Sequence, residues 1–296
     1  MASEVSHLGM CLAHLADLDR HYRDFTKYTL TVALREVIAC YPVYRTYITP
    51  FCDTVQERDK KLIQLAITKA KIQTPAIVSA TYDFIERVLL LDFEKELSPE
   101  DRKICREFVL RFQQITGPVM AKGVEDTAFY SYNRLLSLNE VGGDLNHFGY
   151  SVTEFHRQNH ERLERWPYNF ITSDTHDAKR SEDLRMRINV LSELPEKWDD
   201  ALAVWTRLNE KFRVMIDGKF VPDRNMQYFI YQSLLGGWPG GKQCDEVFRI
   251  RFQDYILKAI REAKEFSNWI NPNEAYETAV SDFIDGILKQ KKFLEI

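Results

Sequence analysis

The chain has 296 residues, a net charge of −4 and only 12 glycines. The low glycine content disfavours an all-β protein with many tight turns and favours long helices. The nearly balanced charge excludes a pervasive basic surface, so neither nucleic acid nor an anionic membrane is expected as a partner.

The cysteines and the apolar runs indicate in which cellular compartment the protein is expected. The five cysteines are dispersed and contain no C-x-x-C pair, so we expect free thiols without disulfides or a metal site. The N-terminus lacks the pattern of a signal peptide. No apolar run approaches the ~20 residues needed to cross a membrane. Together these features predict a cytoplasmic protein.

Amphipathic helices with recognisable starts dominate the chain. Thr54-Val-Gln-Glu57 forms a capping box before apolar residues at helical spacing. Ser98-Pro99 places a cap and a first-turn proline before another such helix. Ser151, with Glu154 three residues later, predicts a helix to about residue 165. Further apolar stripes predict helices over these ranges: 198–212, 248–263 and 274–288. Their aromatic residues could be sugar-stacking platforms, but helical spacing favours core positions.

Strand signals are short and few. Three β-branched or apolar runs predict strands at 43–48, 117–121 and 170–172, each followed by polar residues and then a helix. Short apolar strands between helices are typical of parallel sheets in α/β proteins. Three strands cannot close a barrel, so the sequence predicts part of an α/β domain with helical additions. A soft boundary is expected in the Gly- and Pro-rich stretch 236–241.

The third predicted strand leads into a densely ionisable stretch, in which seven of the eleven residues from 173 to 183 carry ionisable groups. Loops that follow strands are where α/β proteins bind ligands. Asp177 is therefore predicted to stabilise positive charge or grip a hydroxyl, with His176 as an adjacent donor.

The same stretch also fits a simpler interpretation. Ser181 followed by Glu182 and Asp183 is the pattern of a capped helix start with acids in its first turn. This explains the two acids, but it does not explain the His176-Asp177 pair or the Lys179-Arg180 pair.

A second polar group follows the second predicted strand. Gly123 permits a turn, and Lys122 and Glu125 could both face a polar ligand. A surface ion pair at a capped helix start is an equally open interpretation. Phosphate-binding glycine patterns, H-E-x-x-H, G-x-S-x-G and Cys/His metal spacings are all absent from the sequence. No cofactor or metal is expected.

Several long motifs resemble maltooligosyl trehalose synthase. The two longest are GPVMAKGVEDTAFYSYNRLLSLNEVGGD at 117–144 and SDTHDAKRSEDLRMRINVLSELPEKW at 173–198. Residues 39–48, 228–239 and 270–280 are similar to the family as well, so the resemblance covers nearly the whole chain. This family belongs to the α-amylase-like glycoside hydrolases.

The resemblance implies an α/β fold class: part of a (β/α)8 TIM-type barrel with mostly helical inserted subdomains. The expected layout is a helical segment at 1–38, a barrel-like strand and loop at 39–53, a helical insertion at 54–115, a barrel segment with the His-Asp site at 116–193, and a helical subdomain at 194–296.

The activity implied by the resemblance is an intramolecular transglycosylation. Family members convert the reducing-end α-1,4 linkage of a maltooligosaccharide to α,α-1,1, without cofactor or phosphate. The mechanism is retaining, with a carboxylate nucleophile and a second carboxyl group as acid/base. A third carboxylate, which follows a histidine, holds ring hydroxyls of the transferred sugar and stabilises its positive charge.

The resemblance assigns the third carboxylate to Asp177 and a hydroxyl-donor role to His176. It also implies that four further residues line the acceptor side: Lys179, Arg180, Lys122 and Glu125. Asp174 and Ala178 stand where Ser or Thr is expected, but neither departure removes a catalytic group.

The family's nucleophile and acid/base lie upstream of the matching segment, and its members are much longer. We therefore expect an internal portion of the enzyme that is inactive alone. Its uncovered apolar faces should make it associate. Two alternatives stay open: a helical interaction or carbohydrate-binding module, and a shortened α-glucan hydrolase that uses Glu125 with Asp177. The oligomeric state is not predicted.

Overall fold

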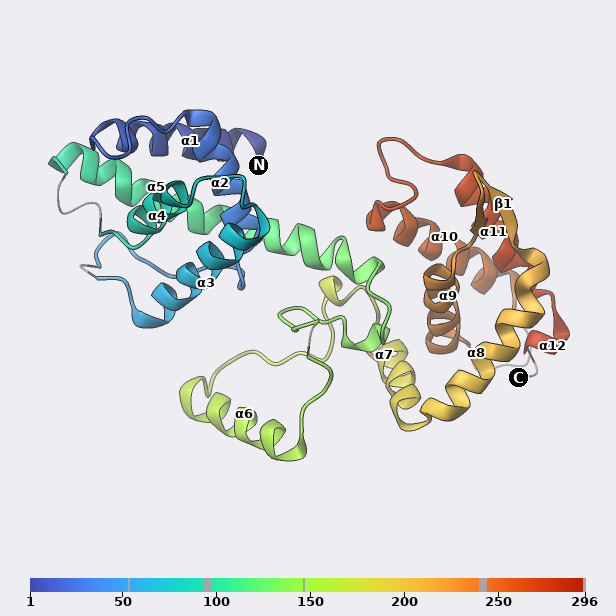
Figure 1. The fold of residues 1–296 in the computed structure, drawn as a ribbon. Coiled ribbons are helices and arrows are strands. Elements are labelled where there is room, and N and C mark those ends of the chain that lie inside the picture. The colour runs from blue at the N-terminus through green and yellow to red at the C-terminus, as the bar shows by residue number, and fades with distance from the viewer. Residues whose placement is uncertain (53, 93–96, 146, 240–243, 295–296) are drawn as a thin grey trace. The chain divides into compact units, whose positions relative to one another are not determined.

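The computed structural model describes residues 1–52, 54–92, 97–145, 147–239 and 244–294. The chain divides into two compact units, unit 1 at Met1–Gly123 and unit 2 at Val124–Ile296 (Figure 1). Each unit has a hydrophobic core of its own. The boundary between them falls inside the predicted 116–193 segment. None of the described helices is long and apolar enough to cross a membrane.

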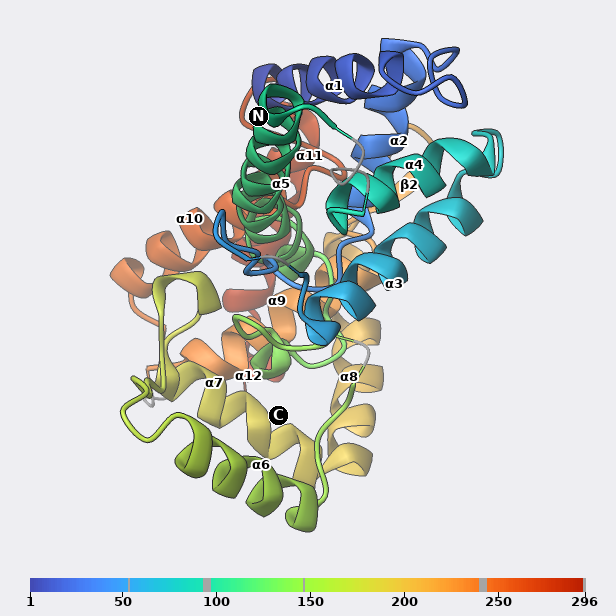
Figure 2. The same cartoon turned by 90° about the vertical axis from the view of Figure 1, so that its left-hand side faces the viewer.

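Unit 1 is helical throughout its described regular structure. Its helices are α1 (Ala2–Asp17), α2 (Lys27–Ala39), α3 (Glu57–Gln73), α4 (Ser79–Leu89) and α5 (Pro99–Met120). Helix α1 packs on α2 and α5, and α3 packs on α2 and α4 (Figure 2). Their apolar faces meet in a core that includes fully buried Leu12, Leu34, Phe84 and Phe108. Each such side chain stabilises the fold by about 1.5–3 kcal/mol.

Of the two predicted helix caps in unit 1, the cap of α5 agrees with the structure and the cap of α3 does not. The Ser98 hydroxyl accepts the Asp101 backbone N–H at 3.2 Å, which confirms the predicted cap of α5. The predicted capping box at Thr54 is wrong in detail. Helix α3 forms, but it begins at Glu57 after Gln56, which makes no side-chain cap bond.

The predicted strand at 43–48 is wrong. These residues form an extended loop, because a side chain takes the place of a neighbouring strand. The Gln113 amide donates to the Ile48 carbonyl at 2.9 Å, and its carbonyl accepts the Ile48 N–H at 2.7 Å. Both polar groups of Ile48 are thereby satisfied without a sheet.

The predicted strand at 117–121 is also wrong. Helix α5 continues through Pro118 to Met120 and then widens into the π-helix η2 (Ala121–Glu125). A proline inside a helix removes one backbone donor and crowds the preceding turn. Since Gln113 and Thr116 are buried on the core face of the same helix, packing maintains the helix past the proline.

Unit 2 contains more, shorter elements. Its 3₁₀ helices are η3 (Ala128–Tyr130), η4 (Leu136–Leu138), η5 (His176–Ala178), η6 (Val190–Glu193) and η7 (Glu210–Phe212). Its α-helices are α6 (Val152–Arg165), α7 (Glu182–Asn189), α8 (Pro195–Asn209), α9 (Arg224–Gly237), α10 (Glu246–Ala263), α11 (Glu274–Leu288) and α12 (Lys291–Leu294).

Most of these helices agree with the periodicity of the sequence. Ser151 caps α6 by accepting the Glu154 N–H at 3.1 Å, and α6 ends at Arg165 as predicted. Helices α8, α10 and α11 fall on the three predicted apolar stripes. The apolar faces of α10 and α11 pack together around buried Ile256 and Phe283. The predicted boundary at 236–241 lies partly outside the described residues.

One small antiparallel hairpin was not predicted. Strands β1 (Val214–Ile216) and β2 (Lys219–Val221) pair around Asp217-Gly218, where both residues have positive φ. Asp-Gly is the sequence signal of such a two-residue turn, so the hairpin was recognisable. It is the only sheet in the part of the chain that the structure describes.

The predicted strand at 170–172 is wrong as well, and the described residues contain no barrel. Phe170 is fully exposed and Ile171 is 78% exposed, and this apolar run pairs with no strand among the residues that the structure describes. It belongs to residues 148–171, which we call the arm. Helix α6 forms the middle of the arm and has no buried residue. Figure 1 shows α6 apart from α8–α12 of the same unit.

Candidate functional site

The ionisable stretch forms a structured loop between the arm and α7. The Thr172 hydroxyl donates to the Asp174 carbonyl at 2.6 Å, and the chain then turns through η5. Helix α7 begins at Glu182 after Ser181, with Glu182 and Asp183 in its first turn. The helix-start interpretation of these two acids is therefore confirmed, although Ser181 makes no side-chain cap bond.

At the centre of the loop, one lysine joins two aspartates. Lys179 has a left-handed backbone (φ 62°), which folds its side chain back over the preceding turn. The Lys179 Nζ lies 3.0 Å from Asp177 Oδ1 and 2.6 Å from Asp126 Oδ1. The Lys179 side chain is only 5% exposed, whereas that of Asp177 is 48% exposed. The arrangement gives a shielded cation and a carboxylate that solvent can reach.

The protonation state of Lys179 follows from these contacts. Burial disfavours the charged amine, but hydrogen bonds to Asp126 and Asp177 outweigh it and raise the pKa of Lys179. Burial also raises the pKa of nearby Tyr130 to about 12, so its phenol stays neutral. The site thus holds one ammonium and two aspartate side chains.

Two buried arginines hold this loop in place through hydrogen bonds to backbone carbonyls. Arg180 is 4% exposed, donates to the Phe129 carbonyl at 3.0 Å and lies over the Phe229 ring at 5.6 Å. Its Nε and Nη1 are buried and have no hydrogen-bond partner among the described residues. Arg185 donates to the Ser173 carbonyl at 3.2 Å, where the loop begins. These contacts fix both ends of the loop.

The predicted site residues therefore occupy different environments. His176 and Asp177 share the loop surface, where His176 is exposed, and Lys179 contacts Asp177 directly. Arg180 is turned into the interior. Glu125 is 4% exposed at the end of η2. Lys122 belongs to unit 1.

Asp126 is the residue of this site that the sequence did not single out. It follows Glu125, which did receive a predicted role, and only the fold brings it to Lys179, 53 residues later. The one available signal was its place in the motif Lys122-Gly-Val-Glu-Asp126, directly after the predicted site residue Glu125.

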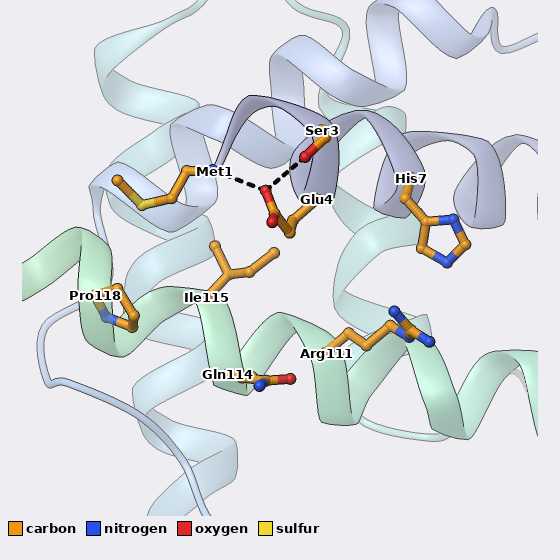
Figure 3. A pocket seen from close by; sticks show the side chains of 8 residues that line it. All are labelled: Met1, Ser3, Glu4, His7, Arg111, Gln114, Ile115 and Pro118. Atoms are coloured by element: carbon orange, nitrogen blue, oxygen red, sulfur yellow. Dashed lines mark hydrogen bonds and ion pairs between the residues drawn. The ribbon is translucent and has the colours of Figure 1, made fainter.

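Unit 1 contains a hollow of about 530 Å³ between α1 and α5. Figure 3 shows His7 and Glu4 on one wall and Arg111 and Gln114 on the other. The Glu4 carboxylate accepts hydrogen bonds from Ser3 and from the terminal amine of Met1. No predicted site residue lines this hollow, and no metal-ligand cluster occurs among the residues that the structure describes.

Comparison with known proteins connects this geometry to one kind of enzyme. No family model matches the chain. Over 182 residues, 62% of its length, the chain is 40% identical to a protein of Mycobacterium tuberculosis named as a maltooligosyl trehalose synthase, of which it covers 22%. The maltooligosyltrehalose synthase from Arthrobacter ramosus matches over 99% of this chain at 32% identity and a TM-score of 0.74.

The chain matches part of maltooligosyl trehalose synthase. The hypothetical maltooligosyl trehalose synthase of Sulfolobus tokodaii gives the same result, with 29% identity and a TM-score of 0.67 over 97% of this chain. The resemblance seen in the sequence motifs is thus confirmed. The chain spans 33% of the Arthrobacter ramosus enzyme and 36% of the Sulfolobus tokodaii protein, about a third of each.

Proposed function

We propose that this chain supplies the sugar-holding carboxylate of a maltooligosyl trehalose synthase. In this proposal the Asp177 carboxylate accepts hydrogen bonds from hydroxyls of the glucosyl unit being transferred and stabilises positive charge at its anomeric centre. The remaining polypeptide of such an enzyme supplies the nucleophile and the acid/base, so the chain alone has no turnover. The reaction converts the reducing-end α-1,4 linkage to α,α-1,1.

The environment of Asp177 is the observation that carries this proposal. Its Oδ1 accepts a hydrogen bond from Lys179 at 3.0 Å, and its Oδ2 has no partner among the described residues. The carboxylate is 48% exposed, so a sugar hydroxyl can reach it. A held but reachable carboxylate is what electrostatic stabilisation of a transition state requires, since little reorganisation is then needed.

The other predicted residues receive roles that suit their surroundings. His176 is exposed beside Asp177 and donates to a second hydroxyl. Lys179 fixes Asp177 and thereby limits escape of the freed glucose. The substrate-binding role of Lys122 is proposed from its motif alone. The burial of Arg180 and Glu125 favours supporting roles beneath the sugar, through the loop and through η2.

We further propose that the barrel expected for this family is completed by polypeptide outside the matching third. Two extended segments of this chain would then gain neighbours. Residues 43–48 lie near Gln113, which now satisfies Ile48, and residues 170–172 expose two apolar side chains at the end of the arm.

A shortened hydrolase that uses Glu125 with Asp177 is disfavoured by burial. A glycosidase carboxyl group must reach the glycosidic oxygen or a water, and Glu125 is only 4% exposed. A helical interaction or carbohydrate-binding module stays a distinct outcome of the test, because it would bind without contributing to turnover.

The test replaces the matching third of the Arthrobacter ramosus enzyme by this chain. The chimera should convert maltopentaose into a non-reducing product, measured as loss of reducing ends, whereas the chain alone should leave maltopentaose unchanged. Lys179→Ala in the chimera should raise the share of free glucose. A folded chimera without turnover, or turnover by the chain alone, would contradict the proposal.

A further inference from the structure

Asp126 lies between two short helical elements. It follows η2 directly and precedes η3, and its side chain is 24% exposed. The Asp126 Oδ1 lies 2.6 Å from the Lys179 Nζ. This is shorter than the contact of Lys179 with Asp177.

The segment that carries Asp126 is anchored on both sides. The Lys264 Nζ, at the end of α10, donates to the Thr127 hydroxyl at 3.2 Å. The Arg180 guanidinium donates to the Phe129 carbonyl at 3.0 Å. Helix α10 also packs on η3. Asp126 is therefore attached to the helical core of unit 2, whereas Asp177 lies half-exposed on a loop.

Asp126 stabilises the buried charge of Lys179 more than Asp177 does. A side chain that is 5% exposed carries its charge at low cost only when anionic partners replace the lost water. Asp177 alone is half-exposed and sits two residues away on the same turn. Without Asp126, the ammonium would be more stable in water than in the interior. The left-handed turn at Lys179 would then lose its contact with Asp126.

We propose that Asp126 is a positioning residue of the Asp177 site, acting through Lys179. Asp126 holds the ammonium at a fixed point, and the ammonium then binds Asp177 Oδ1, which leaves Oδ2 directed to a sugar hydroxyl. One ammonium is shared by two carboxyl groups, so it fixes the direction of Asp177 while it contacts only one of the Asp177 oxygens. This inference rests on the proposed function for its role in catalysis, but the Asp126–Lys179 contact can be tested without it.

The first test uses the full chain and needs no turnover. The titration of the Lys179 side chain is followed by NMR in the unsubstituted chain and in Asp126→Asn. The substitution should lower the Lys179 pKa. Asp83→Asn is the matched control, because it breaks the Lys71–Asp83 pair in unit 1 and should leave Lys179 unchanged. An unchanged Lys179 titration in Asp126→Asn would overturn the inference.

The second test measures catalysis in the chimera. Asp126→Asn should reduce kcat on maltopentaose about tenfold or more, with KM changed less than threefold, because the charge acts mainly on the transition state. Asp126→Glu, which keeps the charge, should recover part of the rate and serves as the second variant if Asp126→Asn does not fold. A normal kcat in folded Asp126→Asn would overturn the inference. If the unsubstituted chimera is inactive, the proposed function fails, and the NMR titration alone decides the Asp126–Lys179 contact.

Discussion

Lys179 and Asp126 are 53 residues apart in the chain, yet the Lys179 Nζ lies 2.6 Å from Asp126 Oδ1. The same ammonium contacts Asp177, whose carboxylate faces solvent. One buried cation therefore connects the anchored part of unit 2 to the loop that carries the proposed sugar ligand. Stability and function of this site should depend on the same side chain.

Removing that cation should destabilise unit 2. Lys179→Met leaves two neighbouring carboxylates without their shared partner, and because both are partly exposed we expect a loss of about 1–2 kcal/mol. Urea unfolding of the purified chain measures this loss. Lys289→Met is the matched control: Lys289 also pairs with a carboxylate of unit 2, that of Asp285, but its side chain is 71% exposed. An equal loss in both variants would contradict the assigned importance of the Lys179 ion pairs.

A glutamine should stabilise unit 1 for a different reason. Gln113 is 1% exposed and satisfies both backbone polar groups of Ile48. Gln113→Ala should therefore leave two buried groups unpaired and cost about 2–4 kcal/mol. Gln114→Ala, the next residue on the same helix, is exposed and should cost less than about 0.5 kcal/mol. Urea unfolding of both variants would refute the account if their losses were similar.

Low pH should reduce the folding stability of unit 2, because Glu277 then becomes protonated. Two Arg261 contacts at 2.9 and 2.7 Å, and a Ser267 hydrogen bond, lower the Glu277 pKa against the effect of burial. Because the folded pKa is below the unfolded one, the stabilisation is present above the ordinary value of 4.5 and is lost as pH falls through the folded value. Glu277→Gln should cost about 2 kcal/mol at pH 7 and flatten the decline in stability below pH ~5. Chemical unfolding at a series of pH values checks this, and an unchanged pH dependence would contradict it.

The arm should make the chain associate. Phe155 is 57% exposed and Phe170 is fully exposed, while no residue of α6 is buried. Exposed large apolar side chains promote association. Sedimentation velocity should show concentration-dependent species that decrease in the double variant Phe155→Ser/Phe170→Ser. Tyr28→Ser removes a single aromatic side chain that is 79% exposed in unit 1 and should leave association unchanged. A monomeric unsubstituted chain would refute this prediction.

The sequence predicted the helices well because their signals are local. The cap at Ser98 and the cap at Ser151 each act within four residues, and apolar periodicity marks the buried faces. The strands were wrong because a strand depends on its neighbours. In the β-branched run at 43–48, the backbone of Ile48 bonds to the side chain of Gln113, 65 residues away. No local pattern reveals such a partner.

The site was predicted in part for the same reason. His176, Asp177 and Lys179 are contiguous and belong to one motif, so the sequence identified them together. Asp126 joins them only through the packing of η3 on α10 and the anchoring of Thr127 by Lys264. The burial of Arg180 was not predicted, because an alternation of charges does not tell which side chain faces the interior.

The central claim is that Asp177 of this chain acts on the transferred glucose of a maltooligosaccharide. The most direct measurement is the rate of reducing-end loss from maltopentaose in the chimera that carries Asp177→Asn, compared with Asp174→Asn in the same loop. We expect a decrease of about 10²–10³-fold in kcat for Asp177→Asn and a nearly unchanged rate for Asp174→Asn. Equal rates in two folded variants would contradict it.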